Sequence, residues 1–121
     1  MGTVLVICSK PNIRKFYVDN LIVRGYPAIG VANLSEGSAK LGKIDEPRQF
    51  TPALVLMWGA LAMLEPDIEN IRQSYADSVP IIVVSDERPA PAWMKKWNIA
   101  DHRAGLSDGR KLMTFLQRWL N

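Results

Sequence analysis

The amino-acid sequence predicts a single doubly wound α/β domain, in which helices on both faces of a parallel sheet give three layers. Short apolar runs without polar alternation are typical of strands buried on both faces. Segments with apolar residues at helical spacing separate these runs. A chain of 121 residues is long enough to bury one hydrophobic core but not two. Five strands alternating with five helices favour the strand order 2-1-3-4-5, the commonest at this size.

The predicted elements alternate regularly along the whole chain, residues 1–121, with no repeat and no linker. The strands are predicted over residues 3–8, 27–32, 53–59, 79–84 and 100–104. The helices are predicted over residues 12–24, 34–41, 66–75, 92–97 and 107–120.

The first strand is an apolar run rich in β-branched residues. Individual residues predict where the helix that follows it begins and ends. Ser9 is a suitable cap, Pro11 suits the first turn and Gly25 ends the helix. The sequence signal for the second strand is weaker than that for the first. Ser35 caps a short helix whose glycines lower its helix propensity. Residues 45–52, which hold two prolines, form the longest polar connection.

The central strand is the apolar run over residues 53–59, and the elements after it follow from prolines and caps. Residues 60–64 are predicted to form an apolar loop, and Pro66 opens the next helix. Pro80 fits only at the start of the fourth strand. The fifth strand is short and polar, and Ser107 caps an amphipathic last helix.

Composition excludes several classes of protein. No apolar run approaches the roughly 20 residues that span a bilayer, and no secretory leader is recognisable, so we expect a cytoplasmic protein without a membrane partner. The single cysteine, Cys8, cannot form an internal disulfide, in agreement with a reducing compartment. A net charge of +3 falls short of the dense basic surface that nucleic-acid binders carry.

The apolar runs and their flanks carry a resemblance that spans nearly the whole chain. The stretches concerned are residues 4–11, 24–26, 52–58, 79–85 and 100–106. They resemble response-regulator receiver domains, whose fold is flavodoxin-like, in hydrophobic pattern and spacing more than in motif identity. In that family an acidic pair stands at Cys8 and Ser9, the phosphate-accepting aspartate at Trp58, a hydroxyl at Ser85 and a lysine at Gly105.

This sequence departs from the family at the positions that carry its chemistry. Trp58 offers no carboxylate nucleophile, Cys8 and Ser9 offer no carboxylates for Mg²⁺, and Gly105 offers no cation. Only Ser85 keeps the family's residue type. We therefore expect a pseudo-receiver that is not an enzyme and holds no metal or cofactor. Trp58 either plugs the lost pocket or acts as a wedge that locks one conformation of the switch.

Other reactive side chains near the pocket have simpler interpretations. A redox role for Cys8 needs a nearby base, and His102 lies two strands away, so a buried inert thiol is favoured. His102 aligns with the family's switch aromatic, or it is a satisfied or solvated side chain on a surface strand. Asp86 and Glu87 follow Ser85 and are expected in a solvated loop.

The last quarter of the chain interleaves tryptophans with basic residues, in the region that binds partners in receiver domains. The predicted partner interface is Trp93, Lys96, Trp97, His102, Arg103 and Trp119. Tryptophan and arginine are enriched at interface hot spots. The alternatives are that the tryptophans belong to the core with the charges on a solvated rim, or that they stack single-stranded nucleic acid.

The sequence therefore predicts a phosphorylation-independent receiver-like signalling module that acts by protein–protein interaction. Its partner is a signalling kinase, an output domain or a second copy of the chain in a homodimer. The alternative function is a small-molecule sensor, which binds its ligand in an apolar crevice at the carboxyl ends of the first and third strands. No nucleophile–base pair, glycine-rich phosphate loop or metal-ligand spacing supports a hydrolase or transferase.

Overall fold

The computed structural model describes residues 2–35, 52–75, 78–104 and 109–120. Its elements, in chain order, are β1 (Val4–Cys8), α1 (Pro11–Val23), β2 (Ala28–Val31), β3 (Leu54–Trp58), α3 (Leu61–Tyr75), β4 (Ile81–Val84), α4 (Pro91–Trp97), β5 (Ile99–Arg103) and α5 (Gly109–Leu120).

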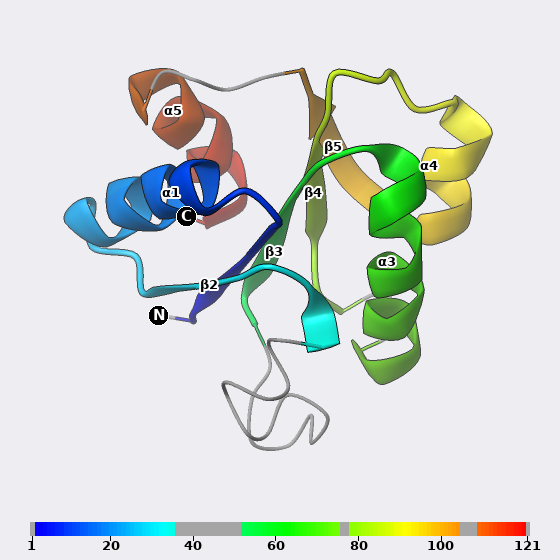
Figure 1. Cartoon of the computed structure of the whole chain (residues 1–121), viewed down its shortest axis with the longest axis horizontal. Coiled ribbons are helices and arrows are strands. Elements are labelled where there is room, and N and C mark those ends of the chain that lie inside the picture. The colour runs from blue at the N-terminus through cyan, green and yellow to red at the C-terminus, as the bar shows by residue number, and fades with distance from the viewer. Residues whose placement is uncertain (1, 36–51, 76–77, 105–108, 121) are drawn as a thin grey trace.

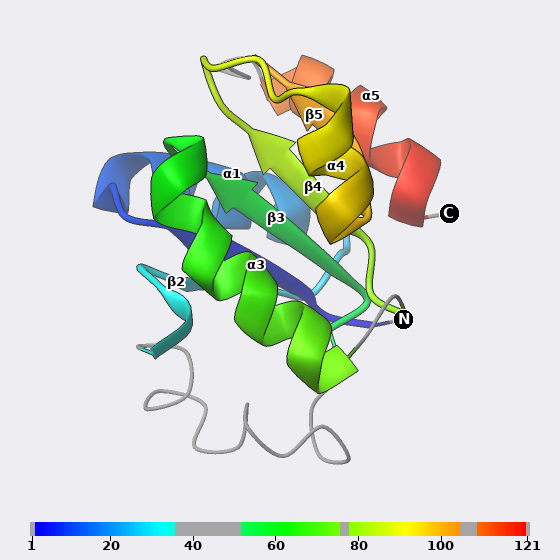
Figure 2. The ribbon, with the colours of Figure 1, turned by 90° about the vertical axis from the view of Figure 1, so that its right-hand side faces the viewer.

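The five strands form one parallel sheet in the predicted order, β2-β1-β3-β4-β5. The register places Cys8 opposite Trp58, and Trp58 opposite Val84. All strands run in the same direction, so the carboxyl ends of β1, β3 and β4 meet at one edge of the sheet (Figure 2). The order reverses between β1 and β3, the point at which ligands bind in sheets of this kind.

Helices cover both faces of the sheet and complete the three predicted layers (Figure 1). On one face, Tyr17 and Leu21 of α1 and Leu116 of α5 belong to a buried cluster with the sheet. On the other face, Ile68 and Ile71 of α3 belong to a second buried cluster. Every residue of β1 and β4 is buried, as expected for strands covered on both sides.

The first helix begins and ends close to its predicted limits. Lys10 is the N-cap and makes no side-chain capping bond, so the expectation that Ser9 caps the helix is wrong. Pro11 takes the first helical position, where its fixed φ starts the helix one residue later than a Ser9 cap requires. Gly25 adopts a φ of 90° just after the helix, a conformation that favours glycine.

Helix α3 begins earlier than the sequence indicated. Residues 60–64 were expected to form a loop, but Leu61 already starts the helix, and Pro66 lies inside it. Pro66 lacks the N–H that would bond the carbonyl of Ala62, which belongs to an exposed residue that water can reach. Burial of Leu64 against the sheet extends the inward stripe by one turn and offsets that loss.

The remaining predicted elements agree in type and differ only at their ends. Strand β4 begins at Ile81, directly after Pro80, and β5 begins at Ile99. Most of the short helix predicted after Ser35, most of the connection over residues 45–52 and the cap Ser107 lie outside the described residues. None of the helices in the described part of the chain is long and apolar enough to span a membrane.

Candidate functional site

A cavity of about 520 Å³ opens at the carboxyl ends of β1, β3 and β4. Ser9, Trp58 and Ser85 line it, so the structure brings together three of the residues predicted for the degenerate phosphorylation pocket. Cys8 is not among the lining residues, and Gly105 lies outside the described part of the chain. The cavity therefore occupies the place of the receiver pocket with a different set of side chains.

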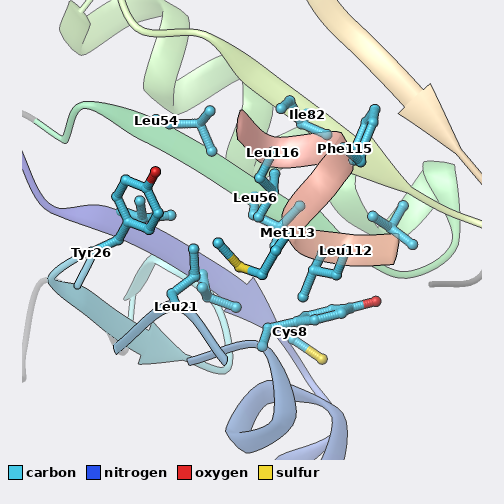
Figure 3. Close-up of a cluster of buried hydrophobic side chains, with 14 residues drawn as sticks. Cys8, Leu21, Tyr26, Leu54, Leu56, Ile82, Leu112, Met113, Phe115 and Leu116 are labelled. Carbon is cyan, nitrogen blue, oxygen red and sulfur yellow. The ribbon is translucent and has the colours of Figure 1, made fainter. Parts of the chain in front are cut away.

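The Cys8 side chain belongs to the core rather than to the cavity. It is fully buried and belongs to the cluster between the sheet and helices α1 and α5, which also contains Leu21 and Leu112 (Figure 3). Burial raises the pKa of the Cys8 thiol, although the Lys10 carbonyl 3.5 Å from Sγ accepts a weak hydrogen bond. The predicted burial of this thiol is confirmed, and the raised pKa keeps it protonated and unreactive at neutral pH.

Ser85 is held by contacts on every polar atom. Its N–H donates to the Arg103 carbonyl at 2.9 Å, and its hydroxyl oxygen accepts the N–H of Glu87 at 3.2 Å. His102 Nε2 lies 3.1 Å from the Ser85 carbonyl oxygen. A carbonyl oxygen only accepts, so Nε2 carries the proton in this contact. His102 therefore joins β5 to the end of β4, which agrees with the expectation of a satisfied histidine.

Trp58 is half-buried, and it packs against the α1–α5 cluster while it also lines the cavity. The Lys10 ammonium lies 5.8 Å from the centroid of the Trp58 ring. That distance is within the range of a cation–π interaction. The indole thus fills part of the site where a receiver holds its phosphate-accepting carboxylate, and it presents a ring face that already attracts a cation.

Carboxylates also line the cavity. Asp86 and Glu87 are exposed, as expected, but they border the cavity as well. Asp67 of α3 is half-buried, and burial raises the pKa of its carboxyl group, although the N–H of Leu34 donates to Oδ2 at 3.3 Å. Among the described residues, none of these carboxylates forms a salt bridge.

The positions at which receivers hold their acidic pair carry other side chains in this chain. Among the residues that the structure describes, no three His, Cys, Asp or Glu side chains gather as a metal site. Cys8 and Ser9, where receivers hold their acidic pair, offer a buried thiol and an exposed hydroxyl. The donors that Mg²⁺ prefers are carboxylate oxygens, which these two positions lack.

The tryptophans of α4 are packed against the domain more than the sequence suggested. Trp93 and Trp97 are half-buried against the α3 side of the core. Trp93 Nε1 donates to the Glu65 carboxylate at 3.2 Å, and the Lys96 ammonium lies 4.8 Å from the Trp97 ring centroid. Trp119 of α5 is 37% exposed. The expected group of three exposed tryptophans is thus divided between two packed against α3 and one at the surface.

Arg72, which the sequence analysis did not single out, joins α3 to the end of α4. Its guanidinium donates to the carbonyl oxygens of Trp97, Val79 and Asn98, each at 2.8 Å. Carbonyls at a helix C-terminus lack partners within the helix, and a cation there also interacts favourably with the helix dipole. The seven-residue helix α4 contains no fully buried residue, so this arginine adds to the attachment that its half-buried tryptophans provide.

Two further contacts join β5 to α5. The Arg103 guanidinium lies 4.8 Å from the Phe115 ring centroid, and Arg118 Nη1 lies 3.7 Å from Asp101 Oδ2. These contacts place exposed positive charge along β5 and α5. The predicted interface residues Lys96, Arg103 and Trp119 are all exposed, whereas His102 is half-buried.

Sequence reasoning missed Lys10, Asp67 and Arg72. Lys10 lies in the turn after β1. Its position at the carboxyl end of a predicted strand is the signal that could have placed it at the site. Asp67 comes three residues after Leu64, but the misplaced start of α3 hid that both belong to one helix. Arg72 carried no local signal, since its partners lie up to 26 residues away.

The fold is that of response-regulator receiver domains, as comparison with solved structures shows. A CheY-like receiver domain protein from Methanospirillum hungatei JF-1 has a TM-score of 0.78 at 16% identity, over 98% of this chain and 92% of the other. The chemotaxis protein CheY4 of Vibrio cholerae has a TM-score of 0.77 at 19% identity, over 98% of both chains.

An orphan response regulator of H. pylori is also similar, with a TM-score of 0.72 at 18% identity, over 99% of this chain and 97% of the other. No family model matches the sequence, and no curated protein matches it. Identities this low establish a common fold, and the departures at Cys8, Ser9 and Trp58 have to be interpreted from this chain itself.

Proposed function

We propose that this chain is a non-enzymatic, phosphorylation-independent signalling module that acts by protein–protein contact. One observation carries the proposal. Where a receiver holds its acidic pair and its phosphate acceptor, this chain holds a buried thiol, an exposed hydroxyl and a half-buried indole. Phosphoryl transfer depends on charges positioned around the reacting group, and these three side chains carry none. A receiver scaffold without that chemistry keeps its surfaces, through which it can still bind a protein.

The contact surface that we propose consists of α4, β5 and α5, with Lys96, Arg103 and Trp119 as its exposed anchors. The Arg72 contacts join α4 to α3, and the His102 contact joins β5 to the end of β4, which favours one fixed conformation of this surface. Exposed Trp and Arg are typical of binding hot spots. The partner is a signalling kinase, an output domain or a second copy of this chain.

Self-association is the form of this proposal that can be tested without knowing another partner. We expect the wild-type protein to form a two-fold dimer at high concentration and Trp119→Ser to be monomeric, because an exposed indole at a dimer centre is a strong anchor. Sedimentation velocity over a concentration series measures both. Val23→Ser is a matched control, since Val23 is 80% exposed on α1, a helix that is not part of the proposed surface.

The control variant should sediment like the wild type. A wild-type protein that stays monomeric at the highest concentration would contradict the dimer. A dimer that survives Trp119→Ser but dissociates on Val23→Ser would place the contact on α1 and not on α4, β5 and α5.

A further inference from the structure

The cavity at the carboxyl edge of the sheet has the size of a small-molecule site. Its volume of about 520 Å³ falls within the roughly 300–1,000 Å³ typical of ligand pockets. It is also larger than the other described cavity, of about 200 Å³, beside α3. It lies where the strand order reverses between β1 and β3, so its position matches the usual ligand site of such folds.

One wall of the cavity is apolar and partly open to solvent. Trp58 and Leu64 contribute to it, and Met63 at its rim is 69% exposed. A flexible thioether and a flat indole can adapt to the shape of an apolar or aromatic body. Met63 is one of the large apolar side chains that stay exposed in the described part of the chain, and a ligand in the cavity would cover it.

The polar wall has an excess of negative charge. Asp67, Asp86 and Glu87 contribute carboxylates, and Lys10 is the one cationic side chain among the described lining residues. Ser85, only 4% exposed, adds a buried hydroxyl whose oxygen already accepts the Glu87 N–H. Such a wall repels phosphate and other anions, and it attracts a positively charged group.

The contact between Lys10 and Trp58 shows where a ligand cation fits. The Lys10 ammonium lies 5.8 Å from the indole centroid, although the Lys10 residue as a whole is exposed and can swing into water. A ligand ammonium at the same ring face would gain the same cation–π attraction. The cavity would also offer it carboxylates that form no salt bridge with any described residue. Lys10 therefore competes with a cationic ligand for this position.

A divalent metal ion suits the site less well than an organic cation. Its carboxylates do not converge, because no group of three potential metal ligands is present among the described residues. Mg²⁺ requires closely arranged oxygen ligands, whereas an alkylammonium tolerates carboxylates spread along a wall. A bare metal ion would also make no favourable contact with the apolar wall of the cavity.

We propose that the cavity between Trp58, Met63, Asp67 and Glu87 binds a small organic ammonium compound. The apolar body lies against Trp58 and Met63, and the ammonium faces the carboxylates near the position of the Lys10 amine. This inference is independent of the contact-surface proposal, because none of the exposed anchors Lys96, Arg103 and Trp119 lines the cavity.

A series of three probes with one aromatic body and different charge tests the ligand class. Phenethylamine, 2-phenylethanol and 3-phenylpropanoate are titrated into the full chain by calorimetry. We expect the amine to bind with a Kd of about 1 mM or lower. The alcohol should bind roughly five-fold more weakly and the carboxylate more weakly still, because partly exposed charge pairs contribute only modestly.

The indole N–H signals in nitrogen-15 NMR spectra locate the bound probe. The chain has four tryptophans, so Trp93, Trp97 and Trp119 provide internal references for Trp58. The Trp58→Leu variant assigns the responding signal by its disappearance. We expect phenethylamine to shift the Trp58 signal and leave the three references unchanged.

Variants of the lining residues test the charge argument in both directions. Lys10→Gln removes the competing cation and should tighten phenethylamine binding by roughly two- to five-fold. Glu87→Gln and Asp67→Asn should each weaken it by a similar factor. Glu69→Gln is the matched control, because it removes the same charge from an exposed position on α3 outside the cavity lining. It should bind like the wild type.

Several results would overturn the inference. They are no measurable binding of the amine, tighter binding of the carboxylate probe, equal binding of all three probes, or weaker amine binding after Lys10→Gln. A response of the Trp93, Trp97 or Trp119 signal without one from Trp58 would place the ligand elsewhere. The wild-type probe series decides the matter even if Trp58→Leu fails to fold.

Discussion

Replacing Arg72 by alanine should lower the free energy of unfolding by about 2–4 kcal/mol. The guanidinium donates to three carbonyl oxygens, and hydrogen bonds from charged groups are worth roughly 1.5–3 kcal/mol each, though not additively. Removing it leaves the carbonyls of Val79, Trp97 and Asn98 without this donor. The loss should appear first as faster hydrogen exchange in α4, which has no buried residue of its own.

Urea unfolding of the wild type and of three variants measures this effect. Arg72→Lys keeps the charge but cannot reach three carbonyls together, so it should recover only part of the stability. Arg88→Ala removes the same charge from an exposed loop residue and should stay within about 0.5 kcal/mol of the wild type. If Arg72→Ala were as stable as Arg88→Ala, the attachment of α4 would have to come from its tryptophans instead.

Replacing Cys8 by aspartate should destabilise the protein by about 3 kcal/mol or more at neutral pH. Cys8 is fully buried among apolar side chains, and a carboxylate there would lose its hydration. The nearby charges of Arg14 and Lys10 would offset only part of that loss, because burial is the largest effect at this position. This substitution restores the residue type that receivers hold at this position. If the expected loss of stability is found, the acidic pair cannot be restored at this position unless the surrounding core is also repacked.

The pH dependence of this variant gives a second test. Burial would raise the pKa of the new carboxyl group above its unfolded value, so the folded state favours its protonated form. The destabilisation should therefore be fully present above that raised pKa and shrink as the pH falls through it. Cys8→Ala, the uncharged control, should cost about 1 kcal/mol at every pH. A variant as stable as this control at pH 7 would show that the position is hydrated.

The fold was predictable because buried parallel strands leave a simple pattern. The runs that became β1, β3 and β4 are apolar throughout, and only a sheet covered on both faces accommodates them. The start of α3 was misplaced because Pro66 looked like the first residue of a helix. That local rule was overridden by Leu64, whose burial against the sheet extends the helix toward its N-terminus.

The candidate site was only partly predictable. The alignment of strand ends placed Ser9, Trp58 and Ser85 at one edge, and the structure brings them to one cavity. The direction of the Cys8 side chain depends on the alternation along β1 and on the packing of α1 and α5, so it sits in the core. Contacts such as that of Arg72 with the end of α4 join residues 25 and 26 apart, beyond the reach of any local pattern.

The most direct test of the central claim is exposure of the protein to a phosphodonor. Wild-type protein is incubated with acetyl phosphate and Mg²⁺ and examined by intact-mass spectrometry, beside a receiver domain that keeps its acceptor aspartate. The account predicts that the control gains one phosphoryl group while this chain keeps its mass, because Cys8, Ser9 and Trp58 supply neither the nucleophile nor the metal ligands. A stoichiometric gain of one phosphoryl group, mapped to Asp67, Asp86 or another side chain of the cavity, would contradict it.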